Sequence, residues 1–390
     1  MDVLYLSALC SAREYERMFQ KYGSVFSHAG QKFNRLLVEG LTQNGCSVEA
    51  VSQRIILKNG EDDLTCPPET ENGVRYTYLP RRKGRWQNRL ATILNGAREI
   101  LRWHRRHPDG VVVCDIILGE LSLALWLVSR FCKIKTTAVV TDVPSIRAGE
   151  TRKGLRAIPY RIKNGLIHSY GSFVFLTEQM NAVLNPKGRP YTVVEGVVDA
   201  DVLSEANTLE SKHPEKVCMM AGLLEDIFGV AALIRAFEKI DCPEARLVFY
   251  GFGGSVPSIE EAGRRDPRIS YRGEVTNQEI VRLEKKASIL INPRPSGEAW
   301  TAFSFPSKNM EYIASGTPLL AYDLPCIPRD YLSCFYAVNS EEELARQLES
   351  MLSQPREKLH AFGLAAQKWI VSEKNSARQG SRIAQMLRAL

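Results

Sequence analysis

The chain has 390 residues, of which 44% are hydrophobic and 24% charged, a balance that excludes a fibre and a disordered chain. Its length favours two domains over a single one. The formal net charge is +7 at pH 7, and the positive excess lies in the first half, chiefly in residues 81–106 and 130–163. An anionic membrane, nucleic acid or plain solvent fits such a surface. We favour the membrane, since the basic stretches lack the interleaved aromatic pattern of a single-strand binder and no DNA-binding motif is found.

Neither a membrane span nor a signal sequence is expected. The longest apolar run, residues 118–128, is broken by Glu120 and is shorter than the ~18 uncharged residues that a span needs. The first residues form a short apolar strand and lack the charged and long apolar regions of a signal peptide. The nine cysteines form no CxxC or CxxH cluster, which indicates a reducing compartment and buried thiols. We therefore expect a cytoplasmic protein.

Short strands alternate with longer helices along the chain. In the first half, strands are predicted at residues 3–6, 48–51, 111–114, 137–140 and 173–176, and helices at 31–44 and 118–131. After a polar stretch at 199–214 the pattern restarts. Strands follow at 217–220, 246–250, 269–271, 289–292 and 318–321, with helices at 231–240, 277–286, 306–314 and 341–353. This alternation predicts parallel sheets built from βαβ units.

Two consecutive doubly wound α/β domains follow from this pattern. The first is expected to span residues 1–200 and the second residues 201–370. The last segment, 371–390, is predicted to be a helix that packs back on the first domain. Because ligands of such sheets bind beyond the carboxyl ends of the strands, we expect a site in a cleft between the two domains.

The most informative segment is 292–318, where a buried strand is followed by a loop and then a helix. The helix is predicted to begin at Pro306, which the first turn tolerates because the missing N–H has no intrahelical partner. Gly316 ends it. The first turn offers amide groups and the positive end of the helix dipole, beside Ser307 and Lys308. This combination suits phosphate oxygens.

Glu311 follows Lys308 by three residues and shares its helix face. A carboxylate one turn inside the helix can accept hydrogen bonds from a ribose diol, so a nucleoside diphosphate could lie along the helix. The alternative is that Glu311 only pairs with Lys308 in an ordinary capped helix. Spacing alone does not decide between the two.

Residues 304–318 read SFPSKNMEYIASGTP, and this segment resembles the signature of retaining glycosyltransferases of the GT-B fold, in the large family-four group. Further matching segments occur in the expected order: AGQKFN at 29–34, TDVP at 141–144, VEGVVD at 194–199, YGFG at 250–253 and YRGEV at 271–275. The resemblance implies two Rossmann-like domains with an interdomain cleft. It also implies transfer of a hexose-type sugar from a nucleoside diphosphate, with retention of configuration.

The same resemblance assigns the donor to the second domain. Glu311 corresponds to the second glutamate of the family's E-x7-E motif, which binds the donor ribose. The other expected donor contacts are Gly251, Gly253, Arg272, Gly273, Val275, Arg294, Ser304, Pro306, Ser307 and Lys308. Lys308 and the helix tip would also stabilise the departing diphosphate, which is a catalytic role. Arg294 could instead be a plain surface residue, and 272–275 a polar loop.

Two departures from the family pattern bear on activity. The first glutamate of the motif falls at position 303, which is Phe303 here, so recognition of the donor sugar is in question. Glu298, in the same loop, is a candidate catalytic replacement or else a solvated loop residue. Many relatives also carry an arginine and a lysine just after the first strand of this domain, but residues 222–229 contain neither.

The first domain is expected to supply the acceptor side of the cleft. Its helix tip offers four candidates, namely Gly30, His28, Lys32 and Asn34. A lone histidine such as His28 is more often structural than functional. Asp142 follows a strand and is the candidate carboxylate for the acceptor or the donor sugar, with a turn or N-cap aspartate before Pro144 as the alternative. Glu195 occupies a cleft position where relatives often carry asparagine.

We expect a retaining hexosyltransferase that acts on a glycan or lipid-linked acceptor in bacterial surface polysaccharide synthesis, at the inner face of the membrane. A cofactor or metal is not implied, since the DxD at 199–201 lies at the domain junction and the glycine turn at 251–254 alone is too weak to indicate a dinucleotide. Two alternatives stay open. One is a non-catalytic glycosyltransferase-like binding subunit, and the other is a nucleotide-sugar epimerase of the same architecture.

Overall fold

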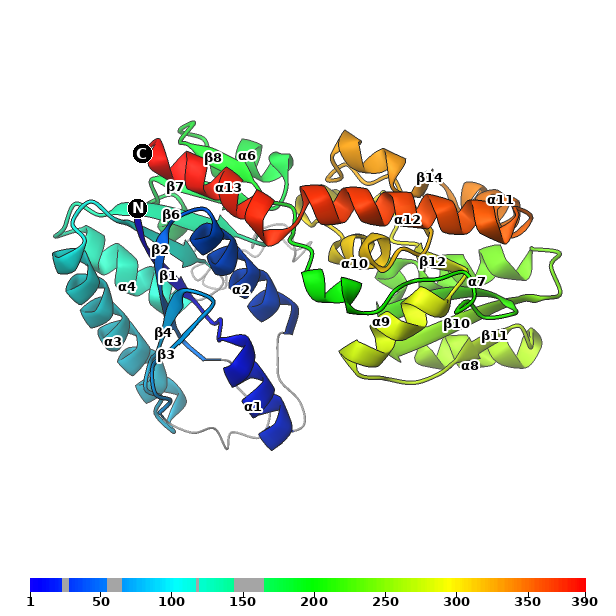
Figure 1. Ribbon diagram of the computed structural model, residues 1–390, viewed down its shortest axis with the longest axis horizontal. Helices are drawn as coiled ribbons and strands as arrows, with labels where there is room; N and C mark the ends of the chain where they lie inside the picture. Colours follow the sequence, from blue (N-terminus) through cyan, green and yellow to red (C-terminus); the bar gives the residue numbers. More distant parts are fainter. Residues whose placement is uncertain (23–27, 55–64, 117–118, 144–164) are drawn as a thin grey trace, which may run out of the picture. The chain divides into compact units, whose positions relative to one another are not determined.

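The computed structural model describes residues 1–22, 28–54, 65–116, 119–143 and 165–390, which form two compact units (Figure 1). Unit 1 comprises Met1–Val197 together with Ser376–Leu390, and unit 2 comprises Val198–Asn375. The chain therefore passes between the units twice. The second passage comes at 375/376, five residues later than the expected 370/371, because helix α12 (Arg356–Glu373) continues to Glu373.

Unit 1 contains an eight-stranded sheet in the order β3-β4-β2-β1-β5-β6-β7-β8. Its strands are β1 (Asp2–Ser7), β2 (Ser47–Ser52), β3 (Glu69–Glu71), β4 (Val74–Tyr78), β5 (Val111–Asp115), β6 (Lys135–Val140), β7 (Ser172–Phe175) and β8 (Tyr191–Val193). All neighbours are parallel except β3 and β4. The central strands are almost fully buried, as their valine-rich sequences predict.

The antiparallel β3–β4 pair is a hairpin that the strand pattern did not predict. Its two-residue loop is Asn72-Gly73, and both residues have positive φ, 49° and 77°. Asparagine followed by glycine is typical of such tight hairpin turns because both tolerate left-handed backbone angles. The first sheet is therefore mixed at one edge.

The helices of unit 1 are α1 (Ala12–Tyr22), α2 (His28–Gln43), α3 (Arg85–Arg106), α4 (Gly119–Ser129), α6 (Glu178–Leu184) and α13 (Ser376–Arg388). Helix α13 lies beside α2 (Figure 1). The two backbones meet at Gly40 and Gly380, where a Cβ on Gly380 would lie 2.2 Å from a backbone carbon of Gly40. The Asn44 amide also donates to the Ala377 carbonyl at 2.7 Å. The C-terminal helix is thus an integral part of unit 1.

Unit 2 contains a six-stranded, fully parallel sheet in the order β11-β10-β9-β12-β13-β14. Its strands are β9 (Lys216–Leu223), β10 (Ala245–Phe252), β11 (Ile269–Tyr271), β12 (Ile289–Asn292), β13 (Leu319–Tyr322) and β14 (Tyr336–Val338). Its helices are α7 (Val230–Glu238), α8 (Val256–Arg265), α9 (Asn277–Lys286), α10 (Ser307–Ser315), α11 (Glu341–Leu352) and α12. The predicted doubly wound α/β class is confirmed for both units.

The strand order of unit 2 reverses between β9 and β12. From β9 the chain moves outward through β10 and β11, and then returns to add β12, β13 and β14 on the other side. In open α/β sheets, ligands bind beyond the carboxyl ends of the strands at such a switch point. The segments that leave β9 and β12 are residues 224–229 and 293–306, and the second leads directly into α10.

Candidate functional site

Helix α10 begins beside the switch point of unit 2. The Asn292 amide, at the end of β12, donates to the Asn309 side-chain oxygen in the first turn of α10 at 2.6 Å. At the end of β9, a Cβ on Gly222 would lie 3.2 Å from the Lys308 Cε atom. The first turn of α10 therefore stands against the carboxyl ends of both central strands.

The buried Tyr312 holds α10 in this position. Its hydroxyl accepts from the Ala221 amide of β9 at 2.8 Å and donates to the Ala221 carbonyl at 3.1 Å. Both backbone groups of one strand residue are thus bonded to one side chain of the helix. Burial raises the pKa of the Tyr312 hydroxyl above its usual value, so it stays neutral and can donate.

The start of α10 has no side-chain cap, and its role as an anion site stays a prediction. Pro306 is the N-cap residue and provides no side-chain cap, and Gly316 ends the helix with φ 79°. Ser307 is exposed at the first position and Lys308 is 33% exposed at the second. The amides of an uncapped first turn, an adjacent hydroxyl and an ammonium are the groups that bind phosphate oxygens at helix N-termini.

Lys308 and Glu311 form an ion pair, with Nζ 3.1 Å from Oε1. Their side chains are 33% and 29% exposed. A third group, the carboxyl of Glu284 from α9, is fully buried and lies 3.9 Å from the Lys308 Nζ atom. Desolvation disfavours the charged lysine, but the Glu311 carboxylate and its neighbours outweigh this effect and raise the pKa of Lys308. Lys308 is therefore a permanent cation beside the helix tip.

Arg294 is buried, only 6% exposed, against the expectation that it could be a plain surface residue. Its guanidinium carbon lies 4.1 Å from the centre of the Trp300 ring. Among the described residues, its Nε and Nη2 atoms have no hydrogen-bond partner. Burial lowers the pKa of Arg294 to about 10. A buried guanidinium in this state would be stabilised by an anion.

The glycines at 251 and 253 have a backbone role. Gly251 and Gly253 have φ of 122° and 153°, and a Cβ on Gly251 would lie 1.9 Å from the Gly222 carbonyl oxygen. The Tyr271 hydroxyl donates to the Gly251 carbonyl at 2.6 Å. These glycines allow the ends of β9 and β10 to approach each other closely, beside the proposed donor position.

The remaining donor candidates lie in loops around this edge. The Gly251 amide donates to the Gly273 carbonyl at 2.9 Å, while Arg272 is exposed and Val275 is 39% exposed. Ser304 lies three residues before the first residue of α10, and its carbonyl accepts from the Cys326 thiol at 3.5 Å.

Glu298 is exposed at the start of the 3-10 helix η4 (Ala299–Phe303). The Thr301 hydroxyl donates to its carbonyl at 2.6 Å. Phe303 ends η4 and is partly buried. Glu298 thus keeps the exposure that a ligand contact needs, and its assignment remains a prediction.

Two of the acceptor-side candidates in unit 1, Asn34 and Glu195, are buried. Asn34 is buried, and its side chain bonds Tyr5 at 2.6 Å and Asp115 at 3.0 Å, so it belongs to the core and is not available to a ligand. Glu195 is also buried and faces α13, where the Gln379 amide donates to it at 3.3 Å. The expectation of a cleft role for these two residues is therefore corrected.

Three other acceptor-side candidates in unit 1 are at least partly exposed to solvent. Gly30 is exposed in the first turn of α2, and Lys32 is half-buried two residues later. Asp142 is half-buried after β6. The side chain of His28 lies outside what the structure describes.

The group that sequence reasoning missed is Glu284. On α9 it lies four residues after the buried Ile280 and thus on the buried helix face. The available signal was a glutamate at an apolar position of an amphipathic helix. Periodicity alone does not reveal that this face meets α10.

Comparison with known proteins agrees with this geometry. Residues 215–354 match the family described as glycosyl transferases group 1. This match covers unit 2 alone, and the chain as a whole has the GT-B fold of the solved structures that it resembles. The matched range covers the sheet of unit 2 and contains α10 and the Lys308–Glu311 pair. No curated protein sequence matches the chain.

Solved structures similar to this chain share its fold over nearly their full length. Sucrose-phosphate synthase from Thermosynechococcus elongatus is 12% identical, with a TM-score of 0.67 over 100% of this chain and 99% of that one. HepE from Anabaena, in complex with UDP, is 12% identical, with a TM-score of 0.62 over 100% of both chains. WaaG, a glycosyltransferase involved in lipopolysaccharide biosynthesis, is 14% identical, with a TM-score of 0.60 over 99% of each chain.

Two further findings concern the described part of the chain. None of its helices there combines the length and hydropathy that a bilayer crossing requires. Across the same ranges, no three His, Cys, Asp or Glu side chains are grouped so that they could hold a metal ion.

Proposed function

We propose that the protein is a retaining hexosyltransferase whose donor is a nucleoside diphosphate sugar bound at the start of α10. The observation that carries the proposal is the position of Lys308 and Glu311 on one face of α10, at the switch point of the sheet. The diphosphate would meet the first-turn amides and Lys308, and the ribose would meet Glu311. Fixed positive charge at this point would stabilise the departing diphosphate without reorganisation.

Arg294 offers a second cation for the donor. It is buried, stacked on Trp300 and without a hydrogen-bond partner at two of its nitrogens among the described residues. We place it near the donor phosphates or the sugar, where an anionic or hydroxyl oxygen would satisfy it. It would then supply part of the charge that the arginine and lysine after the first strand supply in relatives.

A binding screen tests the donor assignment. HepE, one of the structurally similar proteins, is described in complex with UDP, so UDP is the first nucleotide to test. Thermal shift with UDP, GDP, ADP and dTDP should raise the melting temperature for at least one nucleoside diphosphate. Hydrolysis of the matching nucleotide sugar should then follow. If no nucleoside diphosphate stabilises the protein, the donor assignment is wrong.

A second candidate function is a non-catalytic binding subunit. It is favoured by the residues at and after the end of β9, where Leu223 is 45% exposed and Phe228 packs edge-on against Trp300. These positions correspond to the stretch in which relatives carry arginine and lysine. Nucleotide binding without any turnover, across donors and acceptors, would support this candidate over the transferase.

We further propose that the acceptor is a glycan or lipid-linked sugar of bacterial surface polysaccharide synthesis, met at the cytoplasmic membrane face. Helices α3 and α4 of unit 1 support this proposal, since they pack together and enclose a surface groove of about 320 Å³. The groove is lined mainly by Trp86, Leu90, Ile93 and Leu123. Trp86 is 77% exposed, and Phe131, just after α4, is 91% exposed. Exposed aromatic rings of this kind suit a membrane interface.

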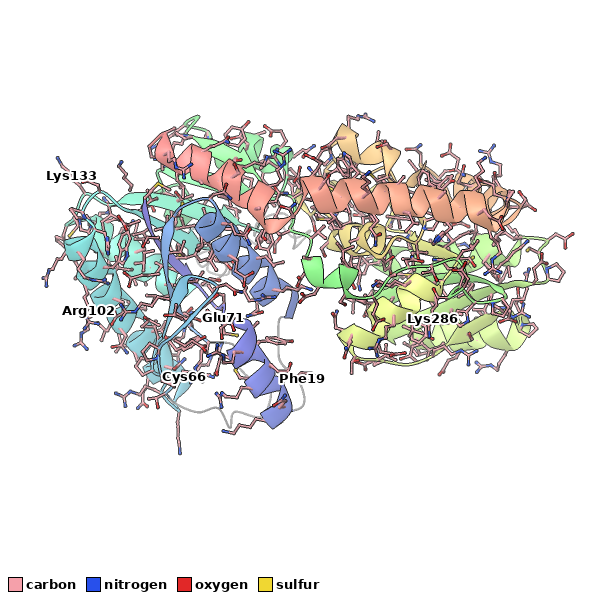
Figure 2. The ribbon with its side chains drawn as sticks, in the orientation of Figure 1. Phe19, Cys66, Glu71, Arg102, Lys133 and Lys286 are labelled. Carbon is pink, nitrogen blue, oxygen red and sulfur yellow. The ribbon has the colours of Figure 1, made fainter. Side chains whose placement is uncertain are left out.

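Basic residues surround this apolar surface. Arg98, Arg102 and Arg105 are exposed on α3, and Arg130 and Lys133 follow at the end of α4. The side chains of Arg102 and Lys133 project away from the ribbon of unit 1 (Figure 2). An anionic bilayer satisfies both features, because each basic residue near its surface contributes about 1 kcal/mol. The predicted basic stretch at 130–163 falls on described residues only as far as residue 143, and the rest of it lies outside the described residues.

Sedimentation with vesicles tests the membrane surface. The wild type should bind vesicles that contain phosphatidylglycerol and not those of phosphatidylcholine alone. Trp86→Ser combined with Phe131→Ser should reduce binding, while Phe252→Ser, a 57% exposed aromatic residue of unit 2, should not. Equal binding to both vesicles, or equal loss with the control, would contradict the proposal.

A further inference from the structure

Glu284 is an ionisable residue in an unusual setting. Its side chain is 0% exposed on α9, beneath the first turn of α10. Among the described residues, no group donates a hydrogen bond to either carboxyl oxygen. The nearest cation, the Lys308 Nζ atom, lies 3.9 Å away, which is beyond hydrogen-bond distance. An ionised carboxylate in this position would be buried and poorly compensated.

The other neighbour of Glu284 is the carboxyl of Glu311, because the two carboxyls share the Lys308 Nζ atom, which lies 3.9 Å from Glu284 and 3.1 Å from Glu311. Two adjacent carboxylates cannot both ionise at little cost, because their charges repel at low dielectric. Glu311 is part exposed and already accepts from Lys308 at 3.1 Å, so it is the member that keeps its charge. Glu284 is the member that keeps a proton.

The charged and titratable groups around Glu284 agree with this division. Burial raises the pKa of Glu284 well above its usual value, and Glu311 raises it further. Lys308 of α10 and Lys285 of α9 act in the opposite direction but do not reverse the shift. Tyr312, the remaining titratable neighbour, is held neutral by burial. A protonated Glu284 can donate one hydrogen bond, and the neighbouring carboxylate of Glu311 is the acceptor.

We propose that Glu284 is a positioning residue of the donor site: it donates a hydrogen bond to Glu311 and holds that carboxylate in place for the ribose of the nucleotide. The inference rests on the proposed function, since it assigns a role through Glu311. Lys308 leaves Glu311 when it turns to the diphosphate. Glu284 remains as the support that keeps Glu311 oriented after that exchange.

Two variants of Glu284 separate positioning from packing. Glu284→Gln is isosteric, uncharged and still able to donate to Glu311. Glu284→Leu fills similar space but cannot donate. With UDP as the probe, the glutamine variant should bind within about threefold of the wild type at pH 7. The leucine variant should lose about tenfold, the value of one charge-assisted hydrogen bond.

The pH profile provides a readout that a purely structural role would not change. As the pH rises, ionisation of Glu284 would place a second negative charge beneath Glu311 and draw Lys308 away from the diphosphate. UDP affinity of the wild type should therefore fall at alkaline pH. The glutamine variant should show a flatter profile over the same range. Measurements from pH 7 upward avoid the titration of the UDP phosphate itself.

Isothermal titration calorimetry of the full chain, with the melting temperature recorded for each variant, gives both results. In the double variant Glu284→Leu with Glu311→Ala, the two losses should not add, because the first acts through the second. The inference would be overturned by additive losses in the double variant. It would also be overturned if Glu284→Leu bound UDP as well as the wild type, or if Glu284→Gln and Glu284→Leu lost equal affinity. If UDP and other nucleoside diphosphates fail to bind the wild type, the proposed function itself fails. If they bind and respond to Lys308 but not to Glu284, only this inference fails.

Discussion

Replacing Lys308 with methionine removes the ammonium group from the first turn of α10 and keeps the length of the side chain. In the proposed complex, this residue makes a charge-assisted hydrogen bond to the diphosphate, worth about 1.5–3 kcal/mol. In the unliganded protein its Nζ atom already pairs with Glu311 at 3.1 Å. Since these side chains are 33% and 29% exposed, that pair is worth less than about 1 kcal/mol. The difference leaves a net loss of about 0.5–3 kcal/mol, or about two- to 150-fold in affinity.

Calorimetry with two ligands isolates this effect. The affinity for the nucleoside diphosphate should fall by the predicted factor, whereas the matching nucleoside, which lacks phosphates, should be affected much less. Lys308→Arg keeps the charge and serves as the matched control. Since the interaction is electrostatic, the wild-type advantage should shrink at high salt. The reasoning is refuted if the methionine variant binds the diphosphate as well as the wild type, or loses nucleoside and diphosphate equally.

Three further predictions concern stability. Tyr312→Phe should lower the free energy of unfolding by about 1–3 kcal/mol in chemical denaturation, because the amide and carbonyl of Ala221 lose their partner inside the protein; an unchanged midpoint would contradict this role. Gly380→Ala should cost about 1–3 kcal/mol, since its Cβ would lie 2.2 Å from a backbone carbon of Gly40, and a neutral effect would show that α13 does not pack there. The pKa of Glu284 is higher in the folded protein than in the unfolded chain, where it is about 4.3. The wild type should therefore lose stability relative to Glu284→Gln as the pH rises from the unfolded pKa to the folded one, by at most about 1.4 kcal/mol per pH unit. Parallel curves of stability against pH for the two proteins would argue against a buried neutral acid.

Much of the fold follows from local pattern. Every predicted strand in both units corresponds to an observed strand, because buried parallel strands have continuous apolar sequences that leave little ambiguity. The predicted helix at 306–314 appears as α10, Ser307–Ser315, between Pro306 and Gly316. The hairpin at Asn72-Gly73 was missed because β3 has only three polar residues and β4 alternates buried with more exposed side chains, although the turn signal was present.

Part of the candidate site also follows from local sequence, and part of it depends on packing between elements. Lys308 and Glu311 are one turn apart on one helix, so their contact follows from helical spacing alone. Glu284 joins them from another helix, and Arg294 is covered by a ring six residues further along the chain. Asn34 and Glu195 were placed at a cleft by resemblance, yet their side chains are bonded within the core of unit 1. Contacts that depend on packing between elements are not encoded in the spacing of residues along one element.

The most direct test of the account is a crystal structure of the full chain with the nucleoside diphosphate that stabilises it most in the thermal-shift screen. We predict diphosphate oxygens within hydrogen-bond distance of the Ser307 and Lys308 amides and of the Lys308 ammonium group, with the ribose hydroxyls on Glu311. A diphosphate bound elsewhere, with the start of α10 unoccupied, would contradict the central claim.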